Sequence, residues 1–208
     1  MIEPGDRGLT VYVVDDDAAV RDSLSLMLGL VGYRTASFES AEALLGAYRD
    51  DWAGCVVADL RLPGMSGLEL QTELRAKGSG LPFVMITAHG DVPSARSAFL
   101  MDAVDFIEKP FDETELRAAI EKALGRESRR LGSARAAEDR DSRLTALTPR
   151  EREVLALVGK GLHAKEIAAS LDISARTVEV HKARLMDKLG ARNVAELVRF
   201  ALAAEKDP

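Results

Sequence analysis

Acidic side chains stand directly after two short apolar segments of this sequence. Asp15 and Asp16 follow residues 10–14, and Asp59 follows residues 55–58. Adjacent carboxylates repel one another, which costs stability unless a cation or basic groups compensate. Mg²⁺ prefers hard oxygen ligands of this kind and usually takes a phosphate oxygen as well. The pattern therefore predicts a metal-supported site at which a carboxylate acts as nucleophile toward a phosphoryl donor.

Two further polar groups follow later apolar segments. Thr87 comes after residues 82–86, and Lys109 comes after residues 104–107. In an open parallel α/β sheet the reactive crevice lies outside the carboxyl ends of the strands, where all of these residues would meet. We expect the Lys109 ammonium to neutralise phosphoryl oxygens and the Thr87 hydroxyl to hydrogen-bond to a bound phosphoryl group.

The elements that must position these groups alternate along the first part of the chain. Strands are predicted at residues 10–14, 33–38, 55–58, 82–86 and 104–107. Helices are predicted at residues 18–31, 40–48, around 68–74, at 92–101 and from Asp112 onward. Five strands alternating with five helices imply right-handed crossovers and a parallel sheet covered on both faces. This order predicts an α/β fold with a doubly wound, five-stranded parallel sheet of the flavodoxin-like type.

The last third of the chain shows helix-start and helix-stop signals without strands. Residues 148–151, Thr-Pro-Arg-Glu, combine an N-cap, a proline at the first helical position and a capping-box glutamate. A short helix at 164–171 and a longer one from Ser174 to Leu189 are separated by a tight turn, and Asn193 opens a fourth helix. These signals predict an all-α, four-helix domain that contains a helix-turn-helix.

The longer helix of this motif has two distinct faces. One face carries an apolar stripe directed at the core, Val178, His181, Leu185 and Leu189. The opposite face presents groups that suit base edges in the major groove, Arg176, Glu179, Val180, Ala183 and Arg184. Flanking side chains are placed for phosphate contacts, Lys165, Thr177, Lys182 and Lys188. As a set, these residues predict an interface for double-stranded DNA.

The chain is predicted to form two unequal domains joined by a linker. The first spans residues 1–125, the linker 126–144 and the second 145–208. The net charge of −6 is concentrated in the first domain, whereas the two later segments are slightly basic. An acidic front suits a cation, and a mildly basic end suits phosphates. The linker is rich in Arg, Ala, Ser and acids, which fits either an exposed helix or a flexible tether.

The sequence also bears on location and redox chemistry. It holds no apolar run long enough to cross a membrane, and its first residues lack the pattern of a signal peptide. We therefore expect a cytoplasmic protein without a membrane partner. Cys55 is the only cysteine, so an intrachain disulfide is impossible and no zinc-ligand pattern forms.

The first domain resembles the receiver domain of two-component response regulators. The resemblance covers about residues 10–124 and rests on Asp15-Asp16, Asp59, Thr87 and Lys109-Pro110 at successive strand ends. It implies that Asp59 accepts a phosphoryl group from a sensor histidine kinase. It also implies roles for further groups: Mg²⁺ bound by Asp15, Asp16, Asp59 and the backbone carbonyl of Arg61, phosphoryl oxygens bound by Lys109, and a switch pair of Thr87 and Phe106.

The second domain resembles the LuxR-type DNA-binding domain. The resemblance covers about residues 144–203 and rests on residues 147–155, 165–168, 173–174, 177–181 and 188–190. Together the two domains resemble a response regulator of the FixJ type. This implies dimerisation on phosphorylation through the fourth helix and fifth strand of the receiver, then binding to paired DNA half-sites near a promoter, with RNA polymerase as a further partner.

Three positions qualify the resemblance to a receiver. Asp102 stands before the fifth strand, where such domains usually have glycine, and aspartate is among the few other residues that tolerate a positive φ. Arg61 and His89 lie two residues after Asp59 and Thr87. Both are candidates for controlling the access of water to an acyl phosphate, and both are equally consistent with solvated loop side chains.

Two other functions fit parts of the sequence. A Mg²⁺-dependent phosphatase or phosphotransferase of the aspartyl-phosphate kind would be expected to have a second acid two residues after its nucleophile, where this chain has Arg61. A signalling protein that binds partners but not DNA would lose no output if Lys165 and Arg184 were replaced by alanine. The sequence favours a phosphorylation-gated transcription factor, not an enzyme.

Overall fold

The computed structural model describes residues 8–88 and 92–204. The chain divides into two compact units, Met1–Leu131 and Gly132–Pro208. Each unit has a separate apolar core, and each is described here by itself.

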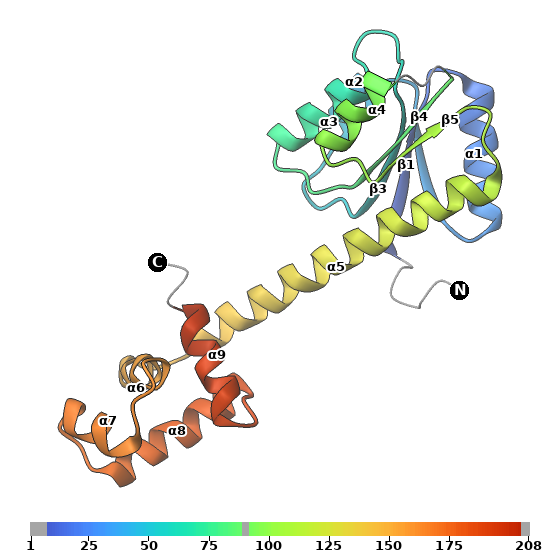
Figure 1. The fold of residues 1–208 in the computed structure, drawn as a ribbon. Helices are drawn as coiled ribbons and strands as arrows, with labels where there is room; N and C mark the ends of the chain where they lie inside the picture. Colours follow the sequence, from blue (N-terminus) through green and yellow to red (C-terminus); the bar gives the residue numbers. More distant parts are fainter. Residues whose placement is uncertain (1–7, 89–91, 205–208) are drawn as a thin grey trace. The chain divides into compact units, whose positions relative to one another are not determined.

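A five-stranded parallel sheet forms the centre of the first unit (Figure 1). Its strands are β1 (Thr10–Val14), β2 (Arg34–Phe38), β3 (Gly54–Asp59), β4 (Phe83–Thr87) and β5 (Asp105–Glu108). Their order across the sheet is β2-β1-β3-β4-β5, with every neighbouring pair parallel. Because Val14 pairs with Ala58, the residues that follow them, Asp15 and Asp59, lie side by side at the carboxyl edge.

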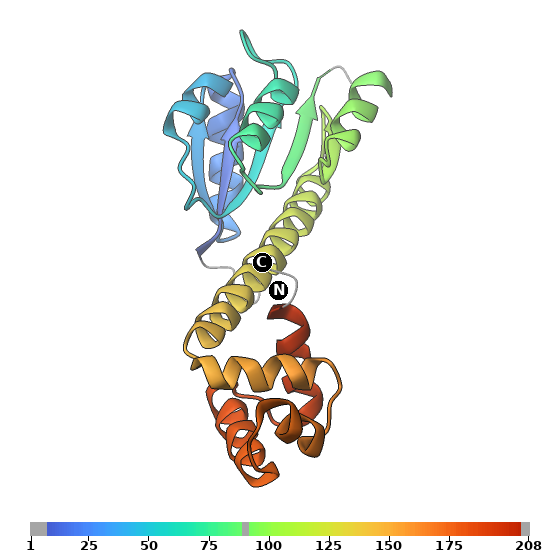
Figure 2. The same ribbon diagram turned by 90° about the vertical axis from the view of Figure 1, so that its left-hand side faces the viewer.

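Helices cover both faces of this sheet (Figure 2). The helices are α1 (Ala18–Leu30), α2 (Ala41–Ala47), α3 (Gly67–Ala76), α4 (Val92–Leu100) and α5 (Glu113–Thr145). One core cluster joins the sheet to α1 and the first half of α5, and a second joins it to α2, α3 and α4. Successive residues of β3 alternate between the two clusters, Cys55 in one and Val56 in the other, which is why the whole strand is buried. The predicted doubly wound fold is confirmed.

Short polar side chains fix the starts of helices in the first unit. The third acid of the first acidic run, Asp17, caps α1 by accepting a hydrogen bond from the Ala19 amide at 2.8 Å. The predicted cap of α5 is also present, since the Asp112 carboxylate accepts from the Glu115 amide at 2.8 Å. Each cap satisfies a backbone donor that the helix itself leaves unpaired.

The helix α5 continues through the segment predicted as a linker. Residues 126–144 lie within α5, so of the two predicted forms, helix or tether, the structure has the helix. Glu127 is fully buried, and Leu131 packs against the core cluster that contains α1. These contacts extend the first compact unit to Leu131, six residues beyond the predicted boundary at residue 125.

Four helices follow α5 and build the second unit around its own core: α6 (Pro149–Gly159), α7 (Ala164–Leu171), α8 (Ala175–Leu189) and α9 (Val194–Ala204). Thr148 and Glu151 form the predicted capping box of α6, and Ser174 caps α8. Asp172, at φ 52°, makes the tight turn between α7 and α8. The predicted helix-turn-helix is therefore α7 and α8. None of the helices described in either unit has both the length and the apolar character needed to cross a bilayer.

Candidate functional site

Two carboxylates and one ammonium meet at the carboxyl edge of the sheet. The Lys109 Nζ donates to Asp15 Oδ2 at 2.7 Å and to Asp59 Oδ2 at 2.6 Å. The Asp15 side chain is 1% exposed and the Asp59 side chain 10%, so both charges are largely removed from water. The strand register brings these residues together across long stretches of sequence, as predicted from their places at strand ends.

Backbone groups orient the two carboxylates. The Asp17 amide donates to Asp15 Oδ1 at 3.0 Å, and the Arg61 amide donates to Asp59 Oδ1 at 2.8 Å. The Arg21 guanidinium donates to the Asp15 backbone carbonyl at 2.7 Å, a contact that sequence patterns did not indicate. Each carboxylate is thus held at both oxygens, which fixes its direction before any ligand arrives.

The charge state of Lys109 is secured by its partners. Partial burial by itself would lower the pKa of this ammonium, but its hydrogen bonds to Asp15 and Asp59 and the negative charges of these two groups outweigh it and raise the pKa above its ordinary value. Lys109 is therefore positively charged throughout the physiological range. Two carboxylates thus share one ammonium, and the Arg21 guanidinium lies beside the Asp15 backbone.

The third predicted metal ligand does not join this cluster. Asp16 is exposed, and the part of the chain that the structure describes has no group of three His, Cys, Asp or Glu side chains close enough to hold a metal ion. Asp15 and Asp59 nevertheless offer the hard oxygens and the negative charge that suit Mg²⁺. The oxygen donors of Asp15 and Asp59 therefore fit the ion. Asp16 does not lie with them in this structure.

Thr87 and Phe106, the predicted switch pair, lie on the neighbouring strands β4 and β5. Thr87 is fully buried, and its carbonyl accepts a hydrogen bond from the Lys109 amide at 2.6 Å. Phe106 is half-buried and packs against the core cluster that contains Ala98 of α4 and Met85 of β4. Phe106 thus packs on the side of the sheet that α2, α3 and α4 cover.

Of the residues predicted to control access of water, the structure describes only one. Arg61 has an exposed side chain and contributes its amide to Asp59. His89 lies outside the described residues.

Asp102, which stands where receiver domains usually have glycine, takes the left-handed conformation expected for that position, with φ 66°. The surface just before it carries two exposed apolar side chains of α4, Phe99 and Leu100, at 51% and 69% exposure.

The predicted DNA surface lies mainly on the outer face of α8. Its base-reading candidates are all exposed, Arg176, Glu179, Val180, Ala183 and Arg184. The predicted inner stripe is buried at Val178, Leu185 and Leu189, and His181 is half-buried. Among the phosphate candidates, Lys165 is exposed on α7 and Thr177 is half-buried. This division between faces agrees with the period of a helix.

Two of the lysines predicted to contact phosphate also hold protein groups. Lys182 donates to Glu179 at 3.1 Å on the surface of α8. Lys188 donates to Glu151 at 2.7 Å, and the Glu151 side chain is only 4% exposed. Since Glu151 also completes the capping box of α6, Lys188 links α8 to the start of α6. A substitution of Lys188 can therefore change the stability of the domain as well as its contact with DNA.

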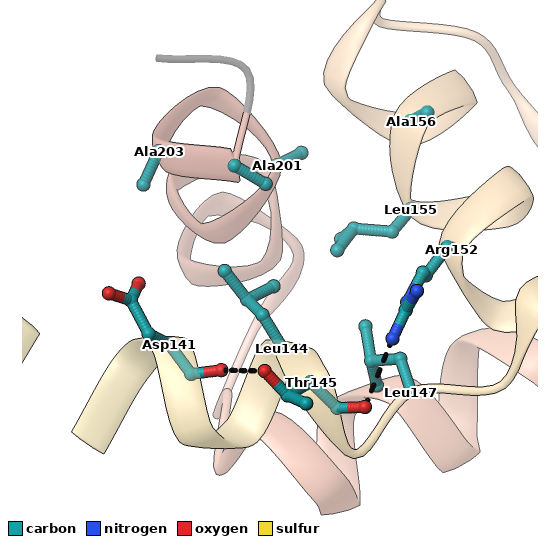
Figure 3. Close-up of a pocket in the computed structure, with 10 residues that line it drawn as sticks. Asp141, Leu144, Thr145, Leu147, Arg152, Leu155, Ala156, Ala201 and Ala203 are labelled. Carbon is teal, nitrogen blue, oxygen red and sulfur yellow. Dashed lines mark hydrogen bonds between the residues drawn. The ribbon is translucent and has the colours of Figure 1, made fainter. Parts of the chain in front are cut away.

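A pocket of the second unit has no counterpart in the sequence patterns. It has a volume of about 500 Å³ and lies between the end of α5, α6 and α9. Figure 3 shows Leu144, Leu155 and Ala201 directed toward it, while Arg152 donates to the Thr145 carbonyl at its edge. Its lining is mostly small or aliphatic.

Comparison with known families assigns both units. Residues 11–121 match the family described as the response regulator receiver domain, and residues 145–201 match the family described as bacterial regulatory proteins, luxR family. A receiver followed by a LuxR-type domain defines the class of DNA-binding response regulators.

Whole-chain relatives narrow the class. The chain is 47% identical to the transcriptional regulatory protein FixJ of Rhizobium meliloti, over 96% of this chain and 98% of that protein. It is 44% identical to FixJ of Bradyrhizobium diazoefficiens, over 93% and 95%. A solved structure of the response regulator StyR has a TM-score of 0.83 at 41% identity, covering 96% of this chain and 99% of that one. The chain belongs to the FixJ-like family of two-component transcriptional regulators.

Proposed function

We propose that this protein is switched by phosphorylation of Asp59 by a sensor histidine kinase, and that the switch promotes dimerisation and sequence-specific DNA binding. The observation that carries the proposal is the pair of carboxylates, Asp15 and Asp59, held on the single ammonium of Lys109. The proposed domains are a receiver at 1–125, a linker at 126–144 and a DNA-binding domain at 145–208. The proposed function of the protein is to regulate transcription, not to turn over a small substrate.

The residues at the sheet edge have complementary parts in phosphoryl transfer. A carboxylate oxygen of Asp59 bonds to phosphorus while the bond from phosphorus to the donor nitrogen breaks. The Lys109 ammonium neutralises charge on the phosphoryl oxygens. The Thr87 hydroxyl then hydrogen-bonds to the bound phosphoryl group, and Phe106 turns inward behind it.

Receiver domains bind Mg²⁺ at the phosphorylation site. In this chain the proposed ligands are Asp15, Asp16, Asp59 and the carbonyl of Arg61. When bound, the ion supplies positive charge that offsets the phosphoryl oxygens. Asp15 and Asp59 already have fixed directions through their amide contacts.

A hollow beside the site suits the kinase as partner. It has a volume of about 440 Å³, lies between α1 and the segment that follows β5, and reaches Lys109. Leu26 and Leu30 of α1 are 67% and 80% exposed, and such apolar side chains in one region are typical of protein contacts. A kinase segment bound there would place its phosphohistidine near Asp59.

The dimer is proposed to form through α4 and β5 of two receivers. Phe99 and Leu100 give this face the exposed apolar area that an interface needs. Joining two DNA-binding domains makes the second half-site contact intramolecular, which raises affinity without any new contact. By linkage, any preference of phosphorylated Asp59 for the dimer must strengthen DNA binding.

The proposed DNA contacts are divided by type. Base edges are assigned to Arg176, Glu179, Val180, Ala183 and Arg184. Phosphates are assigned to Lys165, Thr177, Lys182 and Lys188. RNA polymerase is the proposed partner at the promoter, and the proposed location is the cytoplasm, where kinase and DNA are both accessible.

The proposal is tested with the full-length protein, Mg²⁺ and a small-molecule phosphoryl donor. Intact mass, chromatographic size and binding to randomised duplex DNA are measured on the same samples. We expect a gain of one phosphoryl group, a larger dimer fraction and enrichment of a two-part operator. A stoichiometric mass gain without any change in size or DNA binding contradicts the proposed switch, and repeated turnover of the donor at a rate typical of enzymes contradicts its regulatory nature.

Lys109→Met is expected to slow phosphorylation of Asp59 by about tenfold or more. The variant removes the ammonium from two neighbouring carboxylates and from the phosphoryl oxygens, and one lost charged donor of this kind costs at least about 1.4 kcal/mol. The initial rate of mass gain measures the effect. Lys122→Met is the matched control, because Lys122 bonds to Val104 and Asp105 away from the site. Equal rates for parent and Lys109→Met would contradict the role given to this ammonium.

Two substitutions distinguish contacts with DNA phosphates from contacts with base edges. Lys165→Ala is expected to weaken binding to specific and unrelated duplexes alike and to reduce the salt slope by about one unit. Arg184→Ala is expected to cost about 1–3 kcal/mol on the selected operator and much less on unrelated DNA. Titrations at several salt concentrations measure both quantities. Unchanged affinity in both variants would mean that α7 and α8 do not form the interface.

A further inference from the structure

The turn that ends α4 has aspartate at a position where glycine is the usual residue. Asp102, at φ 66°, donates its amide to the Phe99 carbonyl, and the Ala103 amide donates to the Ala98 carbonyl, both at 2.9 Å. This pair of bonds is a Schellman motif, which normally has glycine at the left-handed residue. Aspartate in this conformation costs free energy that glycine does not, so its side chain requires a reason.

The Asp102 carboxylate lies between two arginines from different helices. Arg126 of α5 donates through both terminal nitrogens, Nη1 to Oδ1 at 2.9 Å and Nη2 to Oδ2. Arg75 of α3 approaches Oδ2 at 3.6 Å. The hydrogen bonds from Arg126 come first among the causes that hold the pKa of Asp102 below its ordinary value, despite partial burial, which raises it. We call Asp102, Arg75 and Arg126 the Asp102 clasp.

A second contact holds the same turn from the side of α3. The Gln71 side-chain amide, which is fully buried, donates to the Met101 carbonyl at 2.7 Å. Residues 101 and 102 are thus bound to α3 by Gln71 and to α5 by Arg126. The end of α4 is fixed to elements on both sides of it.

The fixed turn is next to the groups that the proposed switch uses. Phe99 and Leu100, the exposed apolar pair of the dimer face, directly precede it. Phe106 packs against the core cluster that contains Ala98 of α4, so an inward turn of the ring changes the packing of that cluster. The Asp102 clasp resists displacement of the end of α4 during that change.

We propose that the Asp102 clasp stabilises the position of α4 described above and opposes a rearrangement of α4 on phosphorylation, and thereby weakens the dimerisation that follows. The inference rests on the proposed function, since it concerns the same receiver switch. A contact made in only one of two states shifts their equilibrium by its own free energy. A glycine at this position has no carboxylate and could not form the clasp.

The expected size of the effect follows from the exposure of the clasp. Its side chains are between 37% and 54% exposed, and surface ion pairs of this kind shift equilibria by up to about fivefold. Salt screens them, with a screening length near 10 Å at 0.1 M and near 3 Å at 1 M. The clasp should therefore matter at low ionic strength and lose its influence at high ionic strength.

The test measures the dimer dissociation constant of phosphorylated full-length protein by sedimentation. Asp102→Asn keeps a residue that tolerates positive φ and removes the charge, and Arg126→Gln removes the partner. Arg117→Gln is the matched control, because Arg117 is also on α5 and forms an ordinary ion pair with Glu121 at 3.7 Å. We expect about three- to fivefold tighter dimers for Asp102→Asn and Arg126→Gln, no change for Arg117→Gln, and no further gain in the double variant.

Hydrogen exchange supplies a readout that does not depend on the switch. In the unphosphorylated protein, the amides of Asp102 and Ala103 should exchange about threefold to fivefold faster in Asp102→Asn and Arg126→Gln than in the parent, and the difference should vanish at 1 M salt. Unchanged exchange would show that the clasp does not hold the turn. Faster exchange with an unchanged or weaker dimer would show that it does not oppose activation. Either result overturns the inference.

If the proposed function itself is wrong, the same experiments give a different result. In that case the parent itself gains no phosphoryl group, or gains it without dimerising, whatever the residue at position 102. If the parent dimerises on phosphorylation and the variants behave like Arg117→Gln, the proposed function stands and the clasp is overturned.

Discussion

Asp59→Asn is expected to yield a protein that gains no phosphoryl group and has one fixed DNA affinity, with or without a phosphoryl donor. An amide is not a nucleophile toward phosphorus, and no other carboxylate of the site occupies the end of β3. The whole phosphorylation-dependent gain in affinity, about 5- to 150-fold for ordinary allosteric coupling, should vanish. Intact mass and operator titrations, with and without donor, measure the loss.

The substitution should leave the receiver folded, which the control must establish. The asparagine carbonyl can still accept from the Arg61 amide, and Asp15 still binds Lys109. Asp51→Asn, at an exposed acid paired only with Arg49 among the contacts described, serves as matched control and should behave as the parent. Phosphorylation of Asp59→Asn at another residue with a normal dimer would remove Asp59 from its proposed role.

Glu151→Ala is expected to destabilise the DNA-binding unit by about 3 kcal/mol while leaving the receiver unchanged. Glu151 accepts from the Thr148 amide at 2.8 Å and from Lys188 at 2.7 Å, and its side chain is nearly buried. Its loss removes the acceptor of the Thr148 amide, which is one half of the capping box, and leaves the Lys188 ammonium without its carboxylate. Denaturant unfolding followed by far-ultraviolet circular dichroism should show the destabilised transition.

The distribution of aromatic residues makes the two units separately observable. The single tryptophan, Trp52, stacks on Tyr12 with ring centroids 4.1 Å apart in the receiver, and residues 132–208 contain no tryptophan or tyrosine. Fluorescence should therefore report the same receiver unfolding in parent and Glu151→Ala. Glu153→Ala, which removes a neighbouring exposed ion pair with Arg150, is the matched control. A matching shift in fluorescence would contradict the assignment of Glu151 to the second unit alone.

Acid should reproduce part of the Glu151 effect. Hydrogen bonds from Lys188 and the Thr148 amide lower the pKa of Glu151 from its ordinary value of 4.5 to about 2. A carboxylate with a lowered pKa in the folded state contributes its full stabilisation above 4.5, and that contribution is lost as pH falls toward 2. Partial exposure of Lys188 limits it to about 1–2 kcal/mol. The stability difference between parent and Glu151→Ala should shrink over that range.

The ion pair between Lys188 and Glu151 also affects how a substitution of Lys188 must be interpreted. Lys188→Ala leaves Glu151 nearly buried without its cation, so a loss of DNA binding would not by itself identify a phosphate contact. The fraction of folded second unit must be measured beside DNA affinity. Lys165 has an exposed side chain on α7 and is the clearer reporter of phosphate contacts.

Much of the fold was predictable because its signals are local. Strands and helices alternate with their own periods, and the caps at Asp112, Thr148 and Ser174 each involve a residue only three positions away. The places of Asp15 and Asp59 at the ends of their strands followed from the same patterns. Parallel topology then required them to meet at one edge, which the register confirms.

Contacts between residues far apart in sequence were decided by the tertiary structure. The sequence placed Lys109 at the site but not between Asp15 and Asp59, and it assigned Lys188 to phosphate without Glu151 as its partner. The Asp102 clasp joins three helical regions whose spacing no local pattern specifies. The sequence by itself determined the elements, their order and the family. Only folding determined which charges are paired, because an ion pair depends on the separation of two side chains in space.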